Sequence, residues 1–453
     1  MRPFLNGEGS VDTILVENGT VVTLGQANRV LPGHDVLVVG GKIRRIAPHG
    51  TIPATECRRL DASGRLVMPG FINAHMHFYS TLVRGLGRAR RASNFLEVLQ
   101  HLWWRLDRAL ALEDVYLSAL TVLLDAIRHG TTTLVDHHAS PGAVTGSLAA
   151  LARAVRESGV RACLCYEVSD RDGAAVAAAG LEENAAFARS CDAAGDGRLR
   201  ALVGLHASFT LTDATLERAA RLARELGVGF HVHVAEAAAD QEHCRAQHGC
   251  GVVERFQRHG VLGPHTIAAH CVHVDEGELA LLAESGTAVA HCPQSNANNA
   301  VGVADVPAML RAGVLVGLGT DAMTVDMREE VRAALWLRRL AAGDPGAGFQ
   351  ETLGLLIEGN RRVAERLWPG LGLGELREGG AADIVLLDYH PPTPLNEHTF
   401  LGHLAFGLAA AAVDTTMVGG RVLMAGKRLE IDIDEAAVAA EARARAAALW
   451  ERF

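Results

Sequence analysis

The feature that most constrains this chain is the alternation of short apolar runs with longer amphipathic stretches between residues 71 and 371. Helical stretches such as Glu113–His129, Asp213–Leu226 and Arg328–Leu340 follow strand-like runs. The predicted strands are Phe71–His75, Thr133–Asp136, Ala162–Tyr166, Leu202–His206, Gly229–His233, Thr266–His270, Ala288–His291 and Leu315–Gly319. Eight such alternations predict an α/β fold of the (β/α)8 TIM-barrel type. A doubly wound open sheet is the alternative, but the glycine-rich turn that normally follows its first strand is missing.

Both ends of the chain have a different pattern, with short β-strands separated by turn residues. The predicted strands are Thr13–Val16, Val21–Leu24, Val36–Val39, Ile43–Ile46, Asp383–Leu387, Thr415–Val418 and Arg421–Met424. Turn signals at Glu17-Asn18-Gly19, Gly40-Gly41 and Gly419-Gly420 separate them, and the alanine-rich stretch Glu435–Arg452 is a predicted helix. We therefore expect residues 1–69 and 373–453 to form one small discontinuous β-sandwich domain beside a barrel of residues 70–372.

Composition excludes several classes of function. The chain has 453 residues and a net charge of −9, which argues against a nucleic-acid-binding face. No apolar run reaches the roughly 20 residues of a membrane span, and the first residues lack the apolar core of a signal peptide. Eight scattered cysteines are typical of a reduced, cytoplasmic protein. The apolar stretch Leu404–Val413 leaves room for a homodimer interface.

Lysine is almost absent, which limits the available chemistry. Lys42 and Lys427 are the only two, so residues 43–426 cannot form a Schiff base or supply a P-loop lysine. That stretch cannot offer a carbamylated lysine to bridge two metal ions either.

Metal-binding side chains recur where the predicted barrel strands end. His75 and His77 are two residues apart on one strand, so both can face the barrel mouth and bind one ion. Either His231 or His233 could be a third ligand, and Glu236 lies just past that strand. Later strands end in His270, His291 and, past Leu315–Gly319, Asp321.

Each of these motifs alone could have a purely structural role. For example, His75 and His77 could be two hydrogen-bonded histidines at a polar edge. Together they place histidine or acid at the ends of five strands, where a barrel keeps its catalytic groups. Three histidines and one aspartate suit Zn²⁺, with Fe²⁺ or Mn²⁺ as alternatives.

These motifs resemble the amidohydrolase superfamily over nearly the whole chain. The resemblance rests on Pro69–His77, the His233–Glu236 spacing, His270 and Thr320-Asp321. Within the superfamily the chain is similar to the branch of chlorohydrolases and aminohydrolases of N-heterocycles, closest to the aminohydrolases named SsnA. That closer likeness rests on His77–Thr81, Leu102–Asp107, Gly130–Thr133, Asp136–Pro141 and Pro293–Asn296.

The resemblance implies a single metal ion, Zn²⁺ or alternatively Fe²⁺ or Mn²⁺, held by His75, His77, His233 and Asp321. It favours His233 over His231, because the family's ligand precedes the acid by three residues. It implies that Glu236 is the proton shuttle and that His270 orients the water or the substrate. Asp321 and His270 would also hold the attacking water and accept its proton.

The substrate pocket is less constrained by the sequence. Tyr79, His138, His206 and Asn296 are candidate substrate-binding residues, although an ordinary polar loop role fits each equally well. Of Trp103 and Trp104, at least one should pack in the core, and the other could stack on a planar substrate.

A basic cluster follows the first predicted strand. The arginines are Arg84, Arg88, Arg90 and Arg91. A solvated loop is the usual explanation, and recognition of a substrate carboxylate or ring carbonyl is the alternative.

Three functions remain open on this evidence. The first is a deaminase that replaces the exocyclic amine of a purine, pyrimidine, pterin or triazine ring by water and releases ammonia. The second is a chlorohydrolase, or a formimino or guanidino deiminase, on the same mononuclear site. The third is a non-catalytic descendant, which is disfavoured because all four ligands, Glu236 and His270 are retained. In each case the expected partner is a small molecule rather than nucleic acid or membrane.

Overall fold

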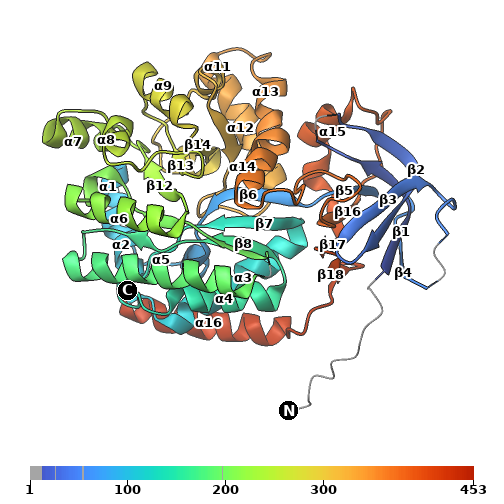
Figure 1. Ribbon diagram of the computed structural model, residues 1–453, viewed down its shortest axis with the longest axis horizontal. Coiled ribbons are helices and arrows are strands. Elements are labelled where there is room, and N and C mark those ends of the chain that lie inside the picture. Colours follow the sequence, from blue (N-terminus) through green and yellow to red (C-terminus); the bar gives the residue numbers. More distant parts are fainter. Residues whose placement is uncertain (1–12, 26, 54–55, 196) are drawn as a thin grey trace.

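The computed structural model describes residues 13–25, 27–53, 56–195 and 197–453, and the alternating middle of the chain forms a barrel with helices around it (Figure 1). Its parallel strands hydrogen-bond in the orders β10-β8-β7-β6 and β15-β14-β13-β12-β11-β9. The strands are β6 (Phe71–Met76), β7 (Thr131–Asp136), β8 (Arg161–Leu164), β9 (Glu167–Val168), β10 (Leu199–Ala201), β11 (Val203–Leu205), β12 (Phe230–Val234), β13 (Ile267–His270), β14 (Ala288–His291) and β15 (Leu315–Leu318). The predicted TIM barrel is confirmed, with its third and fourth strands each interrupted once.

The barrel closes at the place where the first and last strands meet. The backbone amides of Thr320 and Asp321 donate to the carbonyl of His75 over 2.9 and 3.0 Å, and Met76 bridges to Asp321. Closure therefore brings the end of β15 directly against the end of β6.

The barrel helices form where apolar residues recur on one face between capping residues. Helix α6 shows the pattern: Leu216, Ala219 and Ala223 are buried, Thr212 caps the first turn by accepting from the amide of Thr215, and Gly227 ends the helix at φ 66°. The barrel helices are α3 (Leu112–His129), α4 (Ser147–Ser158), α5 (Ala174–Ala194), α6 (Asp213–Leu226), α7 (Ala238–His248), α8 (Val252–Arg258), α9 (Glu276–Ser285), α10 (Pro293–Asn298), α11 (Val306–Arg311), α12 (Met327–Ala342), α13 (Phe349–Gly354) and α14 (Asn360–Leu367).

Shorter helical segments connect these elements. They are η1 (Phe78–Val83), α1 (Phe95–Val98), η2 (Leu99–Trp103), α2 (Trp104–Ala109), η3 (Ser208–Thr210), η4 (Leu355–Gly359), α15 (Phe400–Phe406) and η5 (Leu408–Ala410). The predicted C-terminal helix is confirmed as α16 (Glu435–Arg452), which lies along the outside of the barrel beside α3 (Figure 1). None of the helices in the described residues is both long and apolar enough to cross a membrane.

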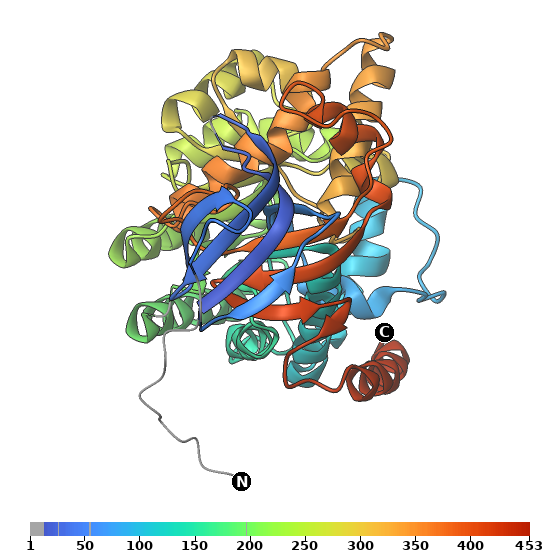
Figure 2. The same ribbon diagram turned by 90° about the vertical axis from the view of Figure 1, so that its right-hand side faces the viewer.

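The two ends of the chain share one sheet, as expected for a discontinuous β-domain. Strand β5 pairs antiparallel with β16, and Figure 2 shows the N-terminal strands beside the C-terminal ones. The order is β19-β18-β17-β16-β5-β1-β2-β3, with β4 paired to β1. The strands are β1 (Thr13–Val22), β2 (Val30–Val39), β3 (Lys42–Pro48), β4 (Arg58–Asp61), β5 (Leu66–Pro69), β16 (Ile384–Asp388), β17 (Ala412–Val418), β18 (Arg421–Ala425) and β19 (Arg428–Leu429).

One sequence expectation in this domain is wrong. Glu17-Asn18-Gly19 does not separate two strands, because β1 runs continuously past it with shifts in its register against β2. Asn18 adopts a φ of 58°, and its amide donates to Asp35 Oδ1 over 2.8 Å. Pairing with the neighbouring strand thus converts a turn-forming triplet into a β-bulge.

Candidate metal and catalytic site

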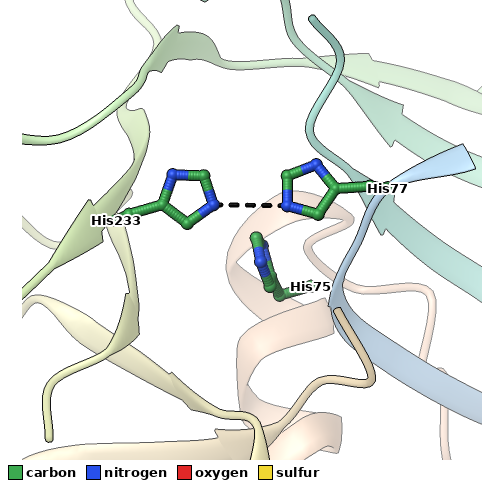
Figure 3. A group of neighbouring side chains, drawn as sticks. All are labelled: His75, His77 and His233. Atoms are coloured by element: carbon green, nitrogen blue, oxygen red, sulfur yellow. Dashed lines mark hydrogen bonds between the residues drawn. The ribbon is translucent and has the colours of Figure 1, made fainter. Parts of the chain in front are cut away.

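The ends of three barrel strands bring the predicted metal ligands together. Ligand nitrogens of His75, His77 and His233 all lie within 4.8 Å of one another (Figure 3). The Nε2 atoms of His77 and His233 are 3.3 Å apart. Asp321 Oδ1 lies 3.0 Å from His77 Nε2 and 3.6 Å from His75 Nε2. Chain closure between β6 and β15 is what places this carboxylate beside the histidines.

Each of the three imidazoles is held through its other nitrogen. The Nδ1 atom of His75 lies 2.8 Å from His231 Nε2, and that of His233 lies 3.0 Å from the carbonyl oxygen of His206. The Nδ1 atom of His77 hydrogen-bonds to the carbonyl of His137. His231 therefore lies behind His75, and all three Nε2 atoms are directed to a common point, as partners of metal-bound histidines direct them.

The chemistry of this donor set fits a divalent metal ion. His75 Nε2 is buried without a hydrogen-bond partner, although a buried polar atom normally has one. Burial lowers the pKa of His75 to about 3, so its imidazole is neutral and has a lone pair to offer. Asp321 supplies the negative charge: burial raises its pKa, but its close contacts with His75 and His77 outweigh burial and hold the pKa well below its usual range.

Glu236 and His270 lie beside this cluster. His270 Nε2 is 3.5 Å from Glu236 Oε2, and Asn299 Nδ2 donates to Glu236 Oε1 over 3.2 Å. Burial raises the pKa of Glu236 to about 7, with the charge of His270 opposing the shift. A carboxyl group with this pKa can both give and take a proton near neutral pH.

Backbone strain accompanies these candidate site positions. Ala235, His270 and Asp321 have φ values of 45°, 71° and 54°, in the left-handed region that non-glycine residues rarely adopt. Such strain persists where the surrounding structure imposes it, and it concentrates at functional sites. Here it turns the chain sharply at the ends of β12, β13 and β15, where the acid, the histidine and the aspartate must face the barrel mouth.

A cavity of about 150 Å³ opens over the cluster. Its walls are mostly apolar and aromatic, and they come from the segment 95–104, from η3 and from the loop after β15. The lining residues include Phe95, Leu96, Leu99, Trp103, Trp104, Phe209, Ala237 and Met323. The predicted residues Glu236, His270 and Asp321 lie on its floor, with His77 and His233. The site can therefore hold a planar ring against a metal ion, an acid and a histidine.

The four predicted substrate residues divide into two pairs. Tyr79 and His206 line the cavity. His138 and Asn296 are not among its lining residues: His138 Nε2 hydrogen-bonds to Ser140 Oγ over 2.9 Å, and Asn296 Oδ1 lies 3.0 Å from His270 Nδ1. A position just past a strand end does not by itself direct a side chain into the mouth, and both of these residues lie behind others.

The structure also brings charged residues to the cavity that the sequence did not indicate. Asp107, Glu167 and Arg171 line it. Glu167 directly follows the third predicted strand, which is the one signal that could have found it. Both tryptophans line the cavity as well, so neither is confined to core packing.

The basic cluster after β6 does not reach the cavity. Arg84 pairs with Asp125 at 3.2 Å and Arg88 with Glu451 at 2.8 Å. Neither these two nor Arg90 and Arg91 line it, which supports the explanation of a solvated loop.

Comparison with known proteins identifies the family. The model of the amidohydrolase family matches residues 66–423. The chain belongs to the amidohydrolase family. A 5-methylthioadenosine/S-adenosylhomocysteine deaminase of Pelotomaculum thermopropionicum is 34% identical over 450 residues, covering 97% of this chain and 99% of the relative. A 5'-deoxyadenosine deaminase of Methanosarcina acetivorans is 31% identical over 444 residues, with 97% and 99% covered.

A solved structure of another protein has a fold similar to that of this amidohydrolase. An adenosine deaminase from Xanthomonas campestris with bound zinc superposes with a TM-score of 0.85 at 27% identity, covering 97% of this chain and 98% of that one. The sequence resemblance to the aminohydrolase branch of the superfamily is thereby confirmed.

Proposed function

We propose that this amidohydrolase is a metal-dependent aminohydrolase that replaces the exocyclic amine of an N-heterocycle by water and releases ammonia. The observation that carries the proposal is the convergence of His75, His77, His233 and Asp321 beside Glu236, at the floor of a cavity with aromatic walls. The names of the relatives, which are deaminases of adenosine-type compounds, support the same reaction.

The ion that the donor set favours is Zn²⁺, one per chain, with Fe²⁺ or Mn²⁺ as alternatives. Three imidazole nitrogens and one carboxylate are a zinc-type donor set, and the similar adenosine deaminase structure contains zinc. When bound, such an ion would make water a nucleophile at neutral pH. The absence of lysine from residues 43–426 agrees with a single ion.

Side chains of the protein would carry out the proton transfers. Asp321 and His270 would hold the attacking water and take its proton, since His270 Nε2 is buried without a hydrogen-bond partner. Glu236 would donate its proton to the ring nitrogen next to the carbon under attack, which removes charge from the tetrahedral intermediate. A second proton delivered to the exocyclic nitrogen lets it leave as ammonia.

The remaining predicted residues have supporting parts in this proposal. Tyr79 and His206 would contact the substrate, and Trp103 or Trp104 would stack on its ring. Asn296 would orient His270 through the 3.0 Å contact to its Nδ1 atom. His138 would hold the ring of Tyr79, whose centroid is 5.7 Å away.

The test is ammonia release by metal-analysed protein across aminated rings: adenosine and its 5'-thioether, guanine, cytosine, a pterin and melamine. Release from one ring by metal-loaded protein, lost when the metal is stripped, is the expected result. Chloride release from a chlorotriazine, or ammonia from formimino-glutamate alone, would replace the proposal with the alternative reaction. Silence from every compound at full metal content would overturn it.

Two further properties belong to this proposal. We propose a homodimer, although half of the stretch Leu404–Val413 is buried within its own chain. The exposed residues Trp336, Leu340 and Phe406 on α12 and α15 are better candidates for the contact. Analytical ultracentrifugation of a Phe406→Asp variant tests this.

Cytoplasmic location is the other property, and the free thiols of Cys163, Cys165 and other buried cysteines support it.

A further inference from the structure

One segment of the chain, residues 84–104, supplies much of the apolar lining of the cavity. Its cavity-lining residues are Phe95, Leu96, Leu99, Trp103 and Trp104, and we call them the aromatic wall. The turn Leu99–Trp103 within it is π-helical, a rare form that is frequent at functional sites. Because Trp103 or Trp104 would stack on the substrate, the position of the aromatic wall determines how firmly a planar ring is held.

The barrel itself holds this segment only weakly. Leu99 is its one buried residue, and the structure describes all of residues 84–104. Apart from the turn that joins it to η1, the hydrogen bonds that it makes to other described elements go to Asp125 on α3 and to Trp450 and Glu451 on α16. A surface segment with so few buried contacts opens locally at a low cost in free energy. Contacts at its outer side therefore decide how often the aromatic wall is in place.

The last turn of α16 holds the start of the segment. Arg88 donates from Nη1 to the main-chain oxygen of Trp450 over 3.1 Å and from Nη2 to Glu451 Oε1 over 2.8 Å. The indole Nε1 of Trp450 donates to the carbonyl oxygen of Leu82 over 2.8 Å, at the end of η1. A Cβ atom added to Gly85 would lie 3.6 Å from Cη2 of Trp450, so the indole ring packs against the main chain there.

The same turn of α16 holds the chain directly after the aromatic wall. Arg105 donates to the main-chain oxygen of Phe453, and its guanidinium carbon lies 4.2 Å from the centroid of the Phe453 ring, a cation–π contact. Arg452 donates from Nε to the carbonyl oxygen of Ala109 over 3.0 Å, at the end of α2. Figure 2 shows the light-blue segment descending the side of the barrel towards this end of α16. One helical turn thus anchors the segment at both ends.

On the basis of the proposed deaminase function, we propose that Trp450, Glu451 and Phe453 are positioning residues for the substrate. We call these three residues the α16 anchor. None of them lines the cavity, so they act through Arg88 and Arg105, which fix the two ends of the segment that carries the aromatic wall. The wall contacts the ring in the ground state and in the transition state alike. Loosening the anchor therefore raises KM and leaves kcat nearly unchanged.

The first experiment removes both contacts of the α16 anchor from the side of the segment. The double variant Arg88→Ala/Arg105→Ala is compared with the parent by steady-state ammonia release from an accepted ring, with metal-loaded protein. We expect KM to rise about fivefold, since exposed charged contacts of this kind each contribute up to about that factor. We expect kcat to stay within about twofold of the parent value. An unchanged KM, or a fall in kcat without a rise in KM, would overturn the proposal.

The matched control is the double variant Arg128→Ala/Arg153→Ala. Arg128 donates from Nε to Glu435 Oε1 over 2.9 Å at the first turn of α16, and the guanidinium carbon of Arg153 lies 4.1 Å from the ring centroid of Tyr116. The control therefore loses the same charge, one ion pair to α16 and one cation–π contact, but neither arginine contacts residues 84–104 in these interactions. We expect its KM to equal that of the parent. An equal rise in KM in both double variants would contradict the proposal.

A second readout does not depend on turnover. Amide hydrogen exchange, followed by mass spectrometry on peptides from residues 84–104, measures how often the segment opens. We expect exchange in this segment to be about fivefold faster in Arg88→Ala/Arg105→Ala and unchanged in Arg128→Ala/Arg153→Ala. If no ring releases ammonia, the proposed function fails, and hydrogen exchange still decides whether the α16 anchor holds the aromatic wall. Unchanged exchange in the first variant, or equal acceleration in both, would overturn the proposal.

Discussion

Replacing Glu236 by glutamine should abolish turnover while leaving the metal site intact. The amide has the same size, and its oxygen can still accept from Asn299 Nδ2, which lies 3.2 Å from Glu236 Oε1. Glutamine cannot give or take a proton, however, whereas the proposed mechanism requires Glu236 to transfer protons to the ring nitrogen and to the leaving amine. Positioned acid–base groups contribute about 10²–10⁴-fold in rate. We expect kcat to fall about 10³-fold or more, which corresponds to about 4 kcal/mol of transition-state stabilisation.

The assay is steady-state ammonia release at matched metal content, with the free energy of unfolding measured alongside. The metal content and KM should change little, because Glu236 is outside the histidine group that would hold the ion. Glu242→Gln, at an exposed position on α7, is the matched control and should retain full activity. A metal-replete Glu236→Gln protein that turns over within about tenfold of the parent would refute the assignment.

Three further predictions address protonation, support and packing. Because burial raises the pKa of Glu236 to about 7 and the protonated carboxyl is the donor, kcat/KM should fall as pH rises above about 7; a flat profile to pH 9 would contradict this. His231→Asn removes the imidazole whose Nε2 lies 2.8 Å from His75 Nδ1, so metal affinity measured against a chelator should fall about 10–100-fold. An unchanged affinity would contradict the role of His231 in orienting His75. Gly319→Ala would place a Cβ 2.7 Å from that of His75, so urea unfolding should show a loss of about 1–3 kcal/mol; Gly263→Ala, with nothing within 4 Å, is the control, and equal losses in both would refute the clash.

The fold was accessible from sequence because the barrel elements carry strong local signals. Strands such as Ala288–His291 are fully buried apolar runs that end in a polar residue, and the predicted boundaries agree with β14. The predicted helix Asp213–Leu226 coincides with α6, since a capping threonine and a left-handed glycine define its two ends. Where the barrel strands end, their parallel arrangement brings residues far apart in sequence together, so the predicted ligand positions converge.

What could not be predicted depends on contacts between distant residues. Asp107 and Arg171 look like ordinary surface charges in sequence, and only the packing of α2 against the loop after β9 buries them as a pair. His138 and Asn296 lie near strand ends, but the direction of each side chain is set by its partner, Ser140 or His270. The bulge at Asn18 likewise depends on pairing with β2.

The central claim is that one metal ion at the histidine–aspartate cluster is required for deamination. The most direct test is to strip the protein of metal and to titrate Zn²⁺ back while following ammonia release from an accepted substrate. The account predicts that activity rises linearly to one equivalent per chain and then stays constant, and that a His233→Ala variant neither binds that equivalent nor turns over. Full activity in the stripped protein, or an equivalent bound by His233→Ala with normal turnover, would contradict it.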